Sequence, residues 1–183
     1  MTQNKSHPTQ FPPAPGGPAV AGRICGSPIT GEAHSLVNPA TESEIAVVGW
    51  ANTDDVNTAV DSAATAQATW AATSGRERAS ALRNCAEALR NNADSLAPLI
   101  TAESGKPLKE AHGEVAFSAR YFEWFAEAIT TQRGDSFTTD ERRFLVNRKP
   151  VGVVVAASPW NFPLSIPVRK VAAALAAGCP VVQ

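Results

Sequence analysis

The sequence predicts an α/β protein in which an N-terminal helical segment leads into the start of a parallel sheet. Two observations carry this prediction. Apolar residues recur at three- and four-residue spacing from about residue 53 to residue 132, which is typical of amphipathic helices. Further on, the β-branched run "VGVVVAAS" at 151–158 precedes a small-residue helical pattern and a second apolar run, "PVVQ", at 180–183. That order is typical of a strand–helix–strand unit.

The composition limits the classes of function. Of 183 residues, 44% are hydrophobic and 18% are charged, as in a globular protein, and the net charge of −1 argues against a nucleic-acid partner. No apolar run reaches the roughly 18 residues of a membrane helix, so we expect no membrane partner. The three scattered cysteines indicate neither disulfides nor zinc and favour the cytoplasm, and the three histidines indicate no metal.

The N-terminal region divides into a tail and a short β segment. Residues 1–20 are rich in Pro, Gly and polar residues, so we predict a disordered tail and assign 21–183 to the folded part. The N-terminus also lacks the apolar core of a secretory signal. Short apolar runs flank Asn38 and Pro39, which predicts a hairpin or a pair of edge strands.

Three helical stretches follow. The first begins with Asn52 or Thr53 as its cap, and the second, over about 76–104, contains one or two helices that end at Gly105. The third covers about 108–132. The spacing places one stripe of apolar residues on each of the last two stretches, namely Ala79, Leu82, Ala86 and Leu89, and then Val115, Ala119, Phe122 and Phe125.

After Gly134 the pattern changes to strands. "RRFLVNRKP" alternates and predicts a strand, and 151–158 predicts a strand buried on both faces. The helix that follows ends at Gly178, and "PVVQ" starts another strand. This is one right-handed crossover of a Rossmann-like sheet. Because one crossover is not a sheet, we expect the chain to be the front part of a longer protein, with an exposed strand edge that favours aggregation.

Asn161 is the candidate functional residue, in the stretch "SPWNFP". Pro159 and Pro163 restrict the residues before them to extended backbone, and the next helix should begin near Pro163 or Leu164. Asn161 then lies at the carboxyl end of a strand, where α/β sheets bind ligands, and its amide can donate to an oxygen that gains charge. The alternative is a turn former or a helix cap.

Two aromatic residues flank this asparagine. Trp160 and Phe162 can either fill the core or form the wall of a ligand site, and from the residues alone we favour the core. Cys179 enters an apolar strand and Cys85 lies in a helix, so we predict both to be inert core residues rather than nucleophiles.

Several motifs together resemble the aldehyde dehydrogenase superfamily. They are "VNPATE" at 37–42, "ESGKPLKEA" at 103–111, "YFEWFAEA" at 121–128, and "PWNFP" followed by "RKVAAALAAGCPVV". The similarity runs from about residue 24 to the end, and it is greatest to the succinate-semialdehyde dehydrogenase branch. It implies that 21–183 is the N-terminal part of an NAD(P)-binding domain, an incomplete cofactor domain that stops before the catalytic domain.

The resemblance also implies an activity and site residues. The family oxidises an aldehyde to a carboxylic acid with NAD or NADP, and Asn161 would donate its amide to the oxyanion. Trp160, Asn161 and Arg169 would lie at the cofactor. Arg169 would also bind the distal carboxylate of the substrate, the alternative being that Arg169 and Lys170 are solvated helix charges.

In the family the catalytic cysteine and glutamate lie beyond Gln183, so we expect this chain to be inactive alone. The full-length form is expected to be a homo-oligomer acting on a small-molecule aldehyde. Two alternatives stay open: a non-enzymatic remnant, and a different member of the superfamily that acts on another aldehyde.

Overall fold

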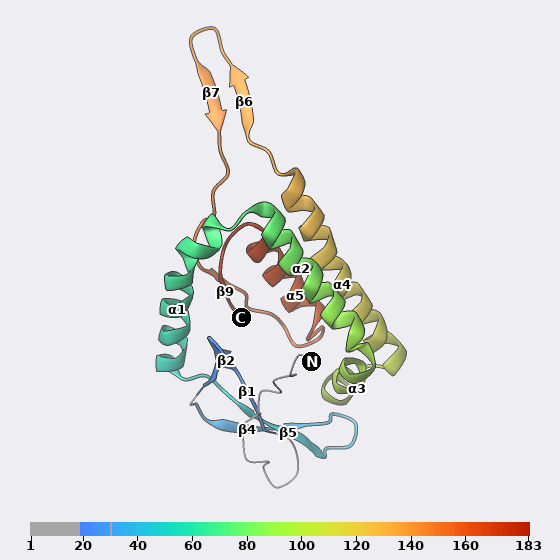
Figure 1. Ribbon diagram of the computed structural model, residues 1–183. Coiled ribbons are helices and arrows are strands. Elements are labelled where there is room, and N and C mark those ends of the chain that lie inside the picture. Colours follow the sequence, from blue (N-terminus) through green and yellow to red (C-terminus); the bar gives the residue numbers. More distant parts are fainter. Residues whose placement is uncertain (1–18, 30) are drawn as a thin grey trace, which may run out of the picture.

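The computed structural model describes residues 19–29 and 31–183. Most of the tail predicted at 1–20 therefore lies outside the described residues, and Ala19 and Val20 belong to the first strand. The mixed α/β class is confirmed: over these described ranges, five helices lie among small sheets (Figure 1). None of the helices in the described ranges is long and apolar enough to cross a membrane.

A small sheet lies at one end of the molecule. Strand β5 (Glu44–Gly49) pairs antiparallel with β4 (Ala33–Val37) and parallel with β1 (Ala19–Ala21). The predicted hairpin is therefore confirmed, and the Asn38 side chain holds its turn by accepting hydrogen bonds from the N–H groups of Ala40 and Thr41, at 2.8 and 3.3 Å. Strands β2 (Arg23–Ile24) and β3 (Ser27–Pro28) form a second, very short hairpin.

Helix α1 (Thr53–Ala72) begins where the sequence predicts. The Asn52 side chain caps it, and Asp55 returns a hydrogen bond to the Asn52 N–H. The helix contacts the rest of the molecule through few groups, and its apolar positions Val56 and Val60 are exposed. One fixed point is the indole N–H of Trp70, which donates to the carbonyl oxygen of Leu175 at 3.1 Å.

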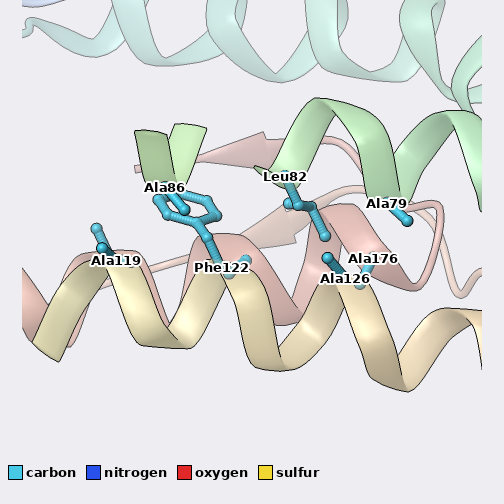
Figure 2. Close-up of a cluster of buried hydrophobic side chains, with 9 residues drawn as sticks. Ala79, Leu82, Ala86, Ala119, Phe122, Ala126 and Ala176 are labelled. Atoms are coloured by element: carbon cyan, nitrogen blue, oxygen red, sulfur yellow. The ribbon is translucent and has the colours of Figure 1, made fainter. Parts of the chain in front are cut away.

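Three further helices follow α1, and their ends agree with the predicted boundaries. They are α2 (Gly75–Asn91), α3 (Ala93–Ser104) and α4 (Leu108–Thr131), and Gly105 ends α3 with a φ of +74°. The main core lies where α2 and α4 meet α5 (Ser165–Ala176), and Figure 2 shows the Phe122 ring directed from α4 toward Ala86 of α2. Its buried members are mostly small: Ala79, Leu82, Ala86, Ala119, Phe122, Ala126, Val168, Ala172 and Ala176.

The hairpin of β6 (Asp135–Thr138) and β7 (Arg143–Val146) projects away from the helices (Figure 1). The predicted strand in "RRFLVNRKP" is confirmed as β7, whereas its partner β6 was not predicted. Every residue of both strands is exposed, and the rings of Phe137 and Phe144 stack on one side with centroids 4.9 Å apart.

The predicted strand–helix–strand unit is present in a reduced form. Strands β8 (Val154–Val155) and β9 (Val181–Val182) pair in parallel, with α5 between them in the sequence. Gly178 ends this unit's helix region with a φ of +85°, as expected. A Rossmann sheet is not formed by the described residues, because β8 and β9 make a sheet of two strands. The prediction that 151–158 is buried on both faces is wrong: Val155 is 70% exposed, so the described residues leave one face of β8 uncovered.

Candidate functional site

The candidate site is the turn of residues 156–164, which joins the carboxyl end of β8 to the start of α5. We call it the Asn161 turn. Helix α5 begins at Ser165 with Pro167 in its first turn, within one residue of the predicted start. The turn therefore occupies the edge at which parallel sheets bind ligands.

Asn161 itself is exposed, and its side chain makes no hydrogen bond with the described residues. Its main-chain carbonyl oxygen, by contrast, accepts a hydrogen bond from Nζ of Lys106 at 3.2 Å. The residue in the cap position of α5 is Leu164, and no side chain of its own turn caps that helix. Asn161 is thus not a helix cap, and its amide remains available to a ligand.

The two aromatic neighbours do not fill the core. Trp160 is 81% exposed, so the preferred interpretation of Trp160 as a core side chain is wrong. Phe162 is 47% exposed, and its ring covers the ammonium group of Lys106 at 4.2 Å from the ring centroid. Neither side chain belongs to the core between α2 and α4, to which α5 contributes Val168, Ala172 and Ala176.

A buried ion pair supports the turn from the side of α4. Lys106 and Glu114 form a salt bridge whose side chains are only 12% and 2% exposed. The other oxygen of Glu114, Oε1, accepts hydrogen bonds from the N–H groups of Leu164 and Ser165 at 2.9 and 3.0 Å. Glu114 therefore caps the N-terminus of α5 from another helix, whereas a capping side chain normally comes from the residue that directly precedes the helix.

The electrostatics of this carboxylate follow from its partners. Burial alone would raise the pKa of Glu114, but the hydrogen bonds from Lys106, Ser165 and Leu164 outweigh burial and lower the pKa. Glu103 shows the opposite behaviour, because burial and the nearby charge of Glu114 raise its pKa. Glu114 is therefore ionised at neutral pH and remains a partner for Lys106.

The residues of the "RK" pair lie on α5 and differ in their contacts. Nζ of Lys170 donates to the carbonyl oxygen of Ala157, at the other end of the Asn161 turn, so Lys170 is not merely a solvated charge. Arg169 is exposed, and its guanidinium carbon lies 5.9 Å from the centroid of the Tyr121 ring. It forms no ion pair with the described residues and is free to meet an anion.

The turn presents one exposed aromatic ring and two polar side-chain groups without partners among the described residues. Trp160 presents an exposed ring, Asn161 a free amide, and the hydroxyl oxygen of Ser158 is buried without a partner among the described residues. In the same ranges, no group of three or more His, Cys, Asp or Glu side chains gathers as a metal site would.

The cysteines lie away from the turn. Cys179 is 2% exposed beyond the far end of α5, which confirms it as a core residue and separates it from Asn161 by about 18 Å of helix. Cys85 is exposed, so the prediction that it lies in the core is wrong, and partial desolvation raises its pKa. On α2 it stands beside, not within, the stripe of Leu82 and Ala86.

Two cavities of the described structure lie elsewhere. One of about 700 Å³ lies between α1, β2 and β9, and another of about 590 Å³ lies between the ends of α4 and α5. Trp160, Asn161 and Arg169 line neither of them.

Sequence reasoning missed Lys106 and Glu114. A signal for Glu114 existed, because it and Ser118 are polar residues within the buried stripe of α4. A buried charge requires a partner, and Lys106 lies eight residues before Glu114 in the "ESGKP" motif.

Comparison with known proteins agrees with the motifs. The model of the aldehyde dehydrogenase family matches residues 28–183. The chain is 45% identical to the mitochondrial succinate-semialdehyde dehydrogenase of Homo sapiens over 147 residues, 79% of this chain and 28% of the human protein. It is 40% identical to the succinate-semialdehyde dehydrogenase [NADP(+)] GabD of Escherichia coli over 154 residues, 83% of this chain and 32% of that protein.

A solved structure shows the same arrangement. The succinate-semialdehyde dehydrogenase from Burkholderia pseudomallei superposes with a TM-score of 0.85 at 37% identity, over 89% of this chain and 35% of that one. The chain therefore spans about a third of the length of the relatives it matches. Since the family model covers most of the sequence, the resemblance inferred from the motifs is confirmed, and the chain belongs to the aldehyde dehydrogenase family.

Proposed function

We propose that this chain supplies the oxyanion donor and part of the cofactor wall of an NAD(P)-dependent aldehyde dehydrogenase. Its preferred substrate in the complete enzyme is succinate semialdehyde. One observation carries the proposal: the side-chain amide of Asn161 is exposed and makes no hydrogen bond with the described residues, while its own carbonyl group and the start of α5 are held.

The overall reaction converts an aldehyde, water and oxidised cofactor into a carboxylate, reduced cofactor and two protons. When the aldehyde carbon is attacked, its oxygen gains negative charge, and an amide already in place stabilises that charge without reorganising. Asn161 performs this role, and loss of one such donor costs on the order of 10²–10³ in rate.

The cofactor is NAD or NADP, and its nicotinamide accepts the hydride. We assign Trp160 and Asn161 of the turn and Arg169 of α5 to contacts with the cofactor, as the family resemblance implies. The Escherichia coli relative carries NADP(+) in its name, which makes NADP the first cofactor to assay. Residues 21–183 then act as the N-terminal part of the cofactor domain, with β8, α5 and β9 starting a Rossmann-like sheet.

Arg169 is assigned to the distal carboxylate of the substrate. Its guanidinium is exposed, has no acidic partner among the described residues and rests near the Tyr121 ring. A guanidinium binds a carboxylate through two parallel hydrogen bonds, which an aldehyde lacking the carboxylate cannot make. Two relatives named above share this substrate in their names.

The assembly and location follow the family as further parts of the proposal. We infer a homo-oligomer for the full-length enzyme and a cytoplasmic location, since all three cysteines are free thiols, as a reducing compartment allows. The human relative is named as mitochondrial, and imaging of a tagged chain separates the two locations.

The test uses a chimera in which residues 28–183 replace the matching segment of the Escherichia coli enzyme. We expect the chimera to form NADPH from succinate semialdehyde and Asn161→Ala to lower kcat about 10²–10³-fold. Asn147→Ala, in an exposed segment near the β6–β7 hairpin, is the matched control and should leave kcat unchanged. An Asn161→Ala chimera with full activity contradicts the proposal.

Two outcomes favour the alternatives. A folded chimera without activity would indicate a non-enzymatic remnant. If Arg169→Ala leaves KM for succinate semialdehyde unchanged relative to butanal, the enzyme acts on another aldehyde. The 183-residue chain alone is expected to form no NAD(P)H, because we assign the catalytic cysteine and glutamate of the family to other parts of the enzyme. Measurable NAD(P)H formation by this chain would contradict that assignment.

A further inference from the structure

We propose that the buried Lys106–Glu114 ion pair is a positioning device that fixes the Asn161 turn for catalysis. The inference rests on the proposed function of Asn161 and names the residues on which that function depends. Neither residue would touch the substrate; both act through the main chain of the turn.

The pair contacts the main chain on the carboxyl side of Asn161. Nζ of Lys106 donates to the carbonyl oxygen of Asn161 at 3.2 Å, and it also contacts Glu114. Oε1 of Glu114 accepts from the N–H groups of Leu164 and Ser165 at 2.9 and 3.0 Å. These two charged side chains thus hold the peptide after Asn161 and the first peptides of α5.

The charges of this arrangement complement each other. The N-terminus of a helix carries a partial positive charge, and Glu114 lies between that end of α5 and the ammonium group of Lys106. The ring of Phe162 covers Lys106 from the outside. The carboxylate is thereby neutralised from two sides and shielded from water, which keeps its hydrogen bonds to the turn short and directed.

The placement of the pair indicates more than a contribution to stability. A buried ion pair is often no more stabilising than apolar residues of the same size, so packing alone does not require one here. Apolar residues could not donate to the Asn161 carbonyl or accept from two main-chain N–H groups. What the pair adds is a fixed main-chain position next to the reacting amide, and misplacement of a catalytic group by about 1 Å can cost about 10²-fold in rate.

The first test measures hydrogen exchange in the 183-residue chain. In Lys106→Met and Glu114→Gln we expect exchange at Leu164 and Ser165 to speed up at least tenfold, with exchange in α2 unchanged. Arg83→Met is the matched control, because it removes the exposed Arg83–Glu127 pair. Unchanged exchange at Leu164 and Ser165 overturns the proposal. If either single variant fails to fold, the double variant Lys106→Met/Glu114→Gln, which leaves no unpaired charge, gives the same readout.

The second test separates positioning from stability by kinetics in the chimera. We expect Lys106→Met to lower kcat about 10–100-fold with little change in KM, and Lys106→Arg to restore part of the loss. In the Asn161→Ala background, Lys106→Met should have almost no further effect, because the group that it positions is gone. Equal losses in both backgrounds would show a merely structural role and overturn the proposal.

The two failures are distinguishable. An Asn161→Ala chimera that keeps its kcat refutes the proposed function. A chimera that loses activity on Asn161→Ala but keeps it on Lys106→Met refutes the positioning role alone. A folded but inactive chimera refutes the proposed function and with it the catalytic role of the pair, and hydrogen exchange then tests only whether the pair holds the turn.

Discussion

The core between α2, α4 and α5 and the Asn161 turn are both held firmly, by different means. The core is held by side chains, mostly alanines, that let three helices approach closely. The turn is held through its main chain by charged side chains of other elements, and Trp160 and Asn161 point out of the core. In a packed core the side chains are occupied by contacts with one another. Main-chain hydrogen bonds, by contrast, hold a segment in place and leave its side chains free for a ligand.

The largest expected effect is the loss of stability caused by a substitution in the core. Leu82 is one of the largest fully buried side chains, and Leu82→Ala should destabilise the chain by about 2–5 kcal/mol through the cavity left behind. Asn161→Ala should change stability by less than about 0.5 kcal/mol, as expected for an exposed side chain that bonds to none of the described residues. Urea unfolding of both variants measures the two changes in the free energy of unfolding. Equal losses of stability would contradict this difference between the core and the turn.

The second effect concerns pH and acts on the turn. The folded-state pKa of Glu114 is lowered from the ordinary value of 4.5, so its contribution to stability is present above that value. The contribution is lost as the pH falls through the lower folded pKa. We therefore expect the wild type to lose more stability than Glu114→Gln when the pH is lowered from 5.

Glu103 provides the control for this prediction, since its pKa is raised and not lowered. The contribution of Glu103 to stability is present while its carboxyl group is protonated and is lost as the pH rises through the folded pKa. Glu103→Gln should therefore reduce the loss of stability that accompanies rising pH, whereas Glu114→Gln reduces the loss that accompanies falling pH. Urea midpoints measured between pH 3 and pH 7 check both signs. Parallel profiles for wild type and Glu114→Gln would contradict the account of the ion pair.

The smallest expected effect concerns the exposed side chain of Val155 on β8. Val155 is exposed and lies on a strand with one partner, so Val155→Thr should change stability by less than about 0.5 kcal/mol while reducing association at high concentration. Light scattering of the two proteins measures this. A large loss of stability would show that the side chain is covered in solution.

The sequence predicts what is local in this molecule. The Asn52 cap, the stop at Gly105 and the turn at Asn38 all follow from residues within a few positions of one another. The apolar stripes of α2 and α4 likewise follow from helical spacing, and their inner residues are buried.

The contacts that were missed join residues far apart in the chain. Glu114 reaches Leu164 across 50 positions and Lys106 reaches Asn161 across 55, and no periodicity encodes such a pairing. The exposure of Cys85 and Trp160 was also misjudged, because a side chain at the boundary of a helix stripe or in a turn can face either way. Burial at such positions depends on which neighbours arrive, which a single sequence does not state.

The most direct test of the central claim compares the side-chain amide of Asn161 with the main chain of its own turn. Nuclear magnetic resonance of the ¹⁵N-labelled chain can measure exchange with water at both, with Asn161→Asp identifying the side-chain signals. We predict rapid exchange of the Asn161 side-chain amide together with slow exchange of the Leu164 and Ser165 N–H groups. A protected Asn161 amide, or freely exchanging N–H groups at the start of α5, would contradict the claim that this turn is held by its main chain to keep one amide free.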